Sequence, residues 1–118
     1  MDDYVLDAHA CVFLLEAPHR LGRDARMAIT RVESGRERAL VPAAVIAEVV
    51  LLKGLGRVGI GLPEIVAKFE TVPSFQFLPL DLAQLDEFVG LPSIRDPFDR
   101  LIVAAARATG ARLISKDV

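Results

Sequence analysis

The sequence has 118 residues, of which 53% are hydrophobic, so it predicts one folded domain with a core over residues 1–118 and excludes a disordered chain. Its net charge of −2 excludes a general attraction to phosphate backbones. A lone cysteine, an acidic start and the absence of any apolar run of about 18 residues predict a cytoplasmic protein with no membrane span.

Short apolar runs alternate with amphipathic segments along the first half of the chain. In chain order they predict a strand over 4–6 and helices over 8–16 and 21–34, then a strand over 39–41 and a helix over 42–55. The lone cysteine, Cys11, lies in an apolar run, which favours a core residue over a nucleophile.

The second half continues this alternation. It predicts a helix over 64–70, a strand over 75–78, helices over 82–89 and 97–109, and a strand over 112–115. Strands that alternate with helices indicate an α/β fold with a mostly parallel sheet flanked by helices, which makes three layers. Ligands of such sheets bind beyond the carboxyl ends of the strands.

Several acidic residues fall at that predicted edge. Asp7 follows the first strand directly, and Asp117 comes just after the last one. Pro97 suits the first turn of a helix, which puts Asp96 at the N-cap and Asp99 three residues later. One interpretation of Asp96 and Asp99 is an acidic capping box, in which they only satisfy backbone donors.

Glu48 is the only charged residue between positions 39 and 52. An ionised carboxylate on an apolar helix is costly unless a positive group meets it. The sequence leaves open a distant arginine partner, an exposed ridge of the helix, or a bound cation.

Together Asp7, Glu48, Asp99 and Asp117, with Asp96 in support, would put four or five negative charges in one pocket. Carboxylates at close range are unfavourable unless a cation neutralises them, and oxygen ligands select Mg²⁺ or Mn²⁺. Such an ion activates water and stabilises charge on phosphoryl oxygens, as phosphodiester hydrolysis requires.

Four segments carry a family resemblance: residues 4–10, 41–48, 95–102 and 113–117. With their Asp-Pro-Phe-Asp-Arg block, they resemble PIN-domain proteins, and specifically the VapC-type ribonuclease toxins of bacterial toxin–antitoxin pairs. The resemblance implies a metal-dependent endoribonuclease in which Asp7, Glu48, Asp99 and Asp117 bind Mg²⁺ or Mn²⁺. It also implies that Asp96 orients a neighbouring residue or a water.

The chain departs from the family pattern in two places. The family usually has Ser or Thr near the start of the helix that carries the glutamate, where this chain has Pro42-Ala43-Ala44. The family also usually continues past the final aspartate into one more strand, whereas this sequence ends at Val118. These departures favour an alternative function, a PIN-like scaffold that binds RNA or protein without cutting.

A receiver-type signalling domain is a further alternative, but no aspartate lies at positions 49–63, where its phosphoacceptor would be expected.

Six arginines between positions 20 and 38 form either a solvated helix face or a basic flank for a phosphodiester. His9 is expected to point away from the pocket. The resemblance implies RNA as substrate and a cognate antitoxin as partner. A second copy of the chain is also expected, because apolar residues over 45–55 and 62–72 are more than one small core is expected to cover, and the same surface would accept the antitoxin.

Overall fold

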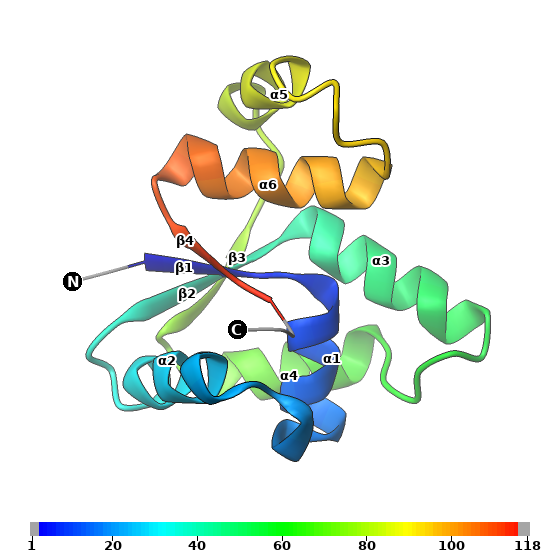
Figure 1. Ribbon diagram of the computed structural model, residues 1–118. Coiled ribbons are helices and arrows are strands. Elements are labelled where there is room, and N and C mark those ends of the chain that lie inside the picture. The colour runs from blue at the N-terminus through cyan, green and yellow to red at the C-terminus, as the bar shows by residue number, and fades with distance from the viewer. Residues whose placement is uncertain (1–2, 116–118) are drawn as a thin grey trace.

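The computed structural model describes residues 3–115. Four strands and six α-helices follow one another along the chain, with one short 3₁₀ turn (Figure 1). Their bounds are β1 Asp3–Leu6, α1 Ala8–Glu16, η1 Pro18–Arg20, α2 Arg23–Glu33, β2 Arg38–Pro42, α3 Ala43–Gly54, α4 Leu62–Glu70, β3 Phe75–Leu78, α5 Leu82–Val89, α6 Pro97–Thr109 and β4 Arg112–Ile114. The predicted α/β class is confirmed.

The strands form one parallel sheet in the order β3-β2-β1-β4. Val5 in the central strand β1 pairs with Leu40 of β2 on one side and with Leu113 of β4 on the other. In Figure 1, α5 and α6 lie on one side of the sheet and α1, α2 and α4 on the other, while α3 leads away from the carboxyl edge. The predicted three layers are therefore present.

The hydrophobic core lies against both faces of β1 and β2. Val5, Leu6 and Val41 are fully buried because these strands are covered on both sides, as central strands of parallel sheets are. Cys11 is also fully buried, which confirms the prediction of a core residue. Burial, and then the negative charge of Asp7, raise the pKa of its thiol to about 12, so the thiolate is scarce at neutral pH.

The predicted and observed elements differ mainly at helix starts. Pro42 was expected to open a helix, but it is the last residue of β2 and the N-cap of α3. The helix expected near residue 64 begins at Leu62, with Pro63 in its first turn and Gly61 as N-cap. Proline fits the first turn and also the position before it, so the residue type alone does not fix the boundary.

None of the helices within residues 3–115 has the length and apolar character needed to cross a membrane.

Each helix that follows a strand begins at the carboxyl edge of the sheet, as strand–helix–strand units require. Both α1 and α3 start there, and so does α6, which feeds back into the amino end of β4. The starts of α1, α3 and α6 therefore lie at the same edge.

Candidate active site

Asp7 joins the end of β1 to the start of α1. It is the N-cap of α1, and the backbone N–H of Ala10 donates to its Oδ1 at 2.7 Å. The side chain is half-buried. An aspartate here satisfies an orphan backbone donor, so the local sequence explains its position without any ligand.

Asp96 and Asp99 open α6 as the sequence predicts. The backbone N–H of Asp99 donates to Asp96 Oδ1 at 3.0 Å, so Asp96 is the N-cap. Both carboxylates are exposed. Asp99 and Asp7 line the same cavity, about 240 Å³ in volume, which Ile102, Val103 and Leu113 complete. The structure thus brings together two residues that are 92 positions apart.

Glu48 lies on α3 in the helical row Ala44, Glu48 and Leu52, and it is half-buried. Its Oε1 is buried and has no hydrogen-bond partner within residues 3–115. Burial, and then the charges of Asp99, Asp96 and Asp7 in that order, raise the pKa of its carboxyl group. Glu48 therefore lies close enough to the three aspartates for their charges to act on it, and within residues 3–115 no ion pair joins it to an arginine.

These observations test whether the residues fit a divalent cation. A hard cation would stabilise a buried oxygen that has no described partner and lies near three other carboxylates. Within the described range, however, no three acidic, histidine or cysteine side chains are arranged as a ready-made metal site. Asp7 and Asp96 each use one oxygen to cap a helix, which partly explains why the acidic side chains do not converge on one point. The donor types fit, and binding would require the side chains to draw together.

Asp117 lies outside the described residues. His9 is exposed, as predicted. Arg31 and Arg38 of the arginine-rich segment lie away from the acidic site. Arg31 bonds to Glu37 and Tyr4, and Arg38 bonds to Asp3, all near the amino edge of the sheet.

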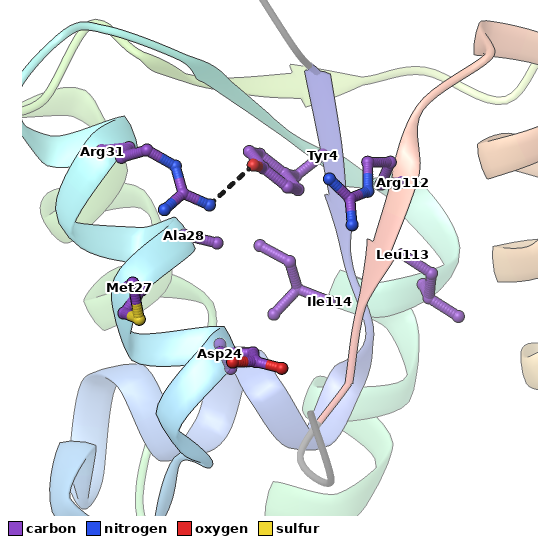
Figure 2. A pocket seen from close by; sticks show the side chains of 9 residues that line it. Tyr4, Asp24, Met27, Ala28, Arg31, Arg112, Leu113 and Ile114 are labelled. Atoms are coloured by element: carbon purple, nitrogen blue, oxygen red, sulfur yellow. Dashed lines mark hydrogen bonds between the residues drawn. The ribbon is translucent and has the colours of Figure 1, made fainter.

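A separate cavity of about 220 Å³ lies between α2 and β4 (Figure 2). Arg31 reaches across it to donate a hydrogen bond to the Tyr4 hydroxyl at 3.0 Å. Met27, Ala28 and Ile114 provide apolar walls. Of the predicted site carboxylates that the structure describes, none lines this cavity, which shares only Leu113 with the cavity of Asp7 and Asp99.

Comparison with known proteins agrees with this arrangement. The PIN domain profile matches residues 4–118. The fold is similar to a chain of the DNA-bound VapBC2 complex of Rickettsia felis, with a TM-score of 0.65 and 17% identity over 94% of this chain and 85% of that one.

A chain of DNA-bound VapBC from Salmonella typhimurium is similar with a TM-score of 0.65 and 14% identity, over 98% of both chains. No curated protein matches the sequence significantly. The match of the profile over nearly the whole length, together with the parallel sheet and its acidic carboxyl edge, places this chain in the PIN domain family.

Proposed function

We propose that this chain is a divalent-metal-dependent endoribonuclease and the toxin of a toxin–antitoxin pair. The observation that carries the proposal is the buried Oε1 of Glu48, which has no hydrogen-bond partner within residues 3–115 and lies within the electrostatic influence of Asp99, Asp96 and Asp7. Family membership supports it, because PIN domains are generally nucleases that use divalent metals. The likeness in fold to chains of VapBC complexes also supports it.

In this proposal Asp7, Glu48 and Asp99 hold Mg²⁺ or Mn²⁺, and Asp117 is a fourth ligand. A bound ion of this kind activates water for attack and stabilises charge on the phosphoryl oxygens. Asp96 holds the first turn of α6 in place through its cap and thereby positions Asp99. Because the carboxylates repel phosphate, RNA approaches the site only after their charge is neutralised.

Cleavage of single-stranded RNA in Mn²⁺ or Mg²⁺ tests the proposal. Asp7→Asn and Asp99→Asn should each lower kcat/KM at least about 100-fold, because loss of a metal ligand exceeds the 10–100-fold typical of outer residues. Asparagine caps helices as well as aspartate does, so Asp7→Asn preserves the start of α1. The matched control is Asp86→Asn, an exposed aspartate of α5.

A second readout separates a nuclease from the scaffold alternative. Saturating Mn²⁺ should raise the Tm of the parent protein by several degrees, since a ligand at about 100 times its Kd stabilises by about 2.7 kcal/mol. Asp99→Asn should reduce this rise, and Asp86→Asn should not. A Tm rise with no cleavage of any RNA would select the scaffold. Equal cleavage by parent and Asp99→Asn would refute the nuclease.

We also propose two protein partners. The likeness to chains of VapBC complexes supports a cognate antitoxin. Exposed apolar side chains support a homodimer, and the largest exposed fractions are 82% at Leu82 and 72% at Val89, both on α5. In the segments from which the sequence predicted excess apolar surface, Val50, Leu51, Leu55 and Leu62 are indeed exposed, whereas Ile65 and Phe69 are buried.

A further inference from the structure

A cavity of about 380 Å³ lies between α1 and the carboxyl-terminal end of α3. One side is a single stripe of α1, formed by His9, Val12, Phe13 and Glu16 at helical spacing. The other side is Leu52 of α3 with Arg57 and Val58 of the loop that follows it. Its volume falls in the range of small-ligand sites, about 300–1,000 Å³.

The loop that closes this cavity is held on both sides. Glu16 Oε1 accepts a hydrogen bond from the backbone N–H of Gly59 at 2.6 Å. Lys53 Nζ donates to the carbonyl oxygen of the same residue at 2.8 Å. A Cβ at position 59 would lie 2.8 Å from Glu16 Oε1, so another residue would displace that carboxylate. These bonds fix Arg57 and Val58 opposite α1.

Two guanidinium groups border the cavity, and neither has a carboxylate partner in an ion pair within the described range. Arg20 lies over the ring of Phe13, 4.4 Å from its centroid. Arg57 is exposed on the loop. Glu16 is the one acidic group that lines the cavity, and its carboxylate is engaged with Gly59. The cavity thus has the guanidinium groups of Arg20 and Arg57 at its border, and its walls include the ring of Phe13 and apolar side chains.

The cavity also adjoins the acidic site. His9 is two residues beyond Asp7, and Leu52 is one helical turn beyond Glu48 on the same row of α3. The helices α1 and α3 contact each other. A strand of nucleic acid with its backbone at the acidic site can therefore place a neighbouring nucleotide in this cavity.

We propose that this α1/α3 cavity binds a nucleotide of single-stranded RNA next to the bond that is cut. This rests on the proposed function. The base stacks against the Phe13–Arg20 pair and the apolar wall, and Arg57 contacts a phosphate, which are the usual means of binding single-stranded RNA. A peptide fits less well, because Arg20 lies over the ring of Phe13 and the cavity lies beside the helices that carry Asp7 and Glu48.

Binding of a fluorescently labelled single-stranded RNA, measured by anisotropy at fixed low salt, tests the proposal. All proteins carry Asp99→Asn, so the RNA stays intact. Arg57→Glu should weaken binding about tenfold or more, because it removes a phosphate contact and adds repulsion. Arg36→Glu is the control with the same charge change, on an exposed arginine before β2 at the amino edge, and it should change the Kd less than about threefold.

Phe13→Ala tests the base itself. It should weaken RNA binding about tenfold, since one base stacked on an aromatic ring accounts for roughly a 5–150-fold effect. It should have little effect on an abasic ribose-phosphate oligomer of the same length. Unchanged affinity in Arg57→Glu, or an equal loss in Arg36→Glu, would overturn the proposal. Because binding is measured without cleavage, this result is independent of whether Asp7 and Asp99 support catalysis.

Discussion

Glu48 combines an unfavourable environment with a central place in the site. Its Oε1 is buried and has no hydrogen-bond partner among the described residues, and the charges of three aspartates act on it. Because its pKa is raised in the folded state, the native protein binds this proton more tightly than the unfolded chain does. Stability therefore falls as pH rises from the ordinary glutamate value of 4.5 through the raised pKa.

Replacement of this carboxylate should stabilise the protein. In EDTA at neutral pH, Glu48→Gln should raise the free energy of unfolding by about 1 kcal/mol, because it removes a buried charge without a partner. The gain should disappear below about pH 4, where both states hold the proton. Urea denaturation across this pH range measures it.

Glu64→Gln serves as the control for this measurement. Glu64 is exposed in the first turn of α4, where a negative charge is favourable, so its loss should not stabilise. A gain in Glu64→Gln equal to that in Glu48→Gln would contradict the assignment of the effect to the acidic site. So would a gain that is independent of pH.

At the scale of elements, the N-terminus of α6 combines a structural role with a proposed functional one. Asp96→Ala removes the acceptor for the Asp99 N–H and should cost about 1 kcal/mol of stability. Asp96→Asn keeps the cap and should keep the stability. Both variants should lower RNA cleavage about tenfold, because each also removes the negative charge that acts on Glu48.

Thermal denaturation and cleavage assays on the same two proteins separate these roles. Full activity in Asp96→Asn together with a lowered Tm in Asp96→Ala would reduce Asp96 to a cap alone. An unchanged Tm in Asp96→Ala would show instead that the observed hydrogen bond contributes little. Comparison of Tm and cleavage activity in the two variants thus distinguishes a residue that only caps the helix from one that also supports the site.

The sequence predicts the helices and strands well because the residues that begin and end them are local signals. Apolar runs, prolines and the Asp-Pro step before α6 identify strands and helix starts from a few residues each. The isolation of Glu48 in an apolar segment marks it as unusual, although the sequence alone left open an arginine partner, an exposed ridge or a cation. These signals need no knowledge of distant contacts, so the alternation of strands and helices follows directly.

Other features depend on contacts between distant segments. Glu16 and Gly59 are 43 positions apart, and their hydrogen bond shapes the α1/α3 cavity. No local pattern indicates that pairing. In retrospect, the spacing of His9, Val12, Phe13 and Glu16 marks a continuous face of α1. The burial of Phe69 against Phe75 and Phe77 similarly depends on where β3 joins the sheet.

At the scale of the whole molecule, α5 presents an apolar stripe that this chain leaves open. Leu82, Leu85 and Val89 are exposed at positions i, i+3 and i+7, which puts them on one face of the helix. The helix contacts α6 on its other side. A second copy that packs the same stripe against it would cover both stripes through a two-fold axis.

This arrangement predicts a dimer that depends on α5. Light scattering after size exclusion should give twice the mass of the 118-residue chain at high concentration. Leu82→Asp with Val89→Asp should give a monomer, because a charge in an apolar contact is not compensated there. Leu82 begins the helix, so an aspartate at that position should not disturb α5 itself.

Met27→Asp is the matched control for the dimer. Met27 is 49% exposed on α2, which lies on the other side of the sheet from α5. The control should remain dimeric, since α2 takes no part in the proposed contact. A monomer at every concentration of the parent protein would refute the homodimer. Dissociation by Met27→Asp alone would show that the dimer interface includes α2 and not α5. The apolar face of α5 would then be available to a different partner.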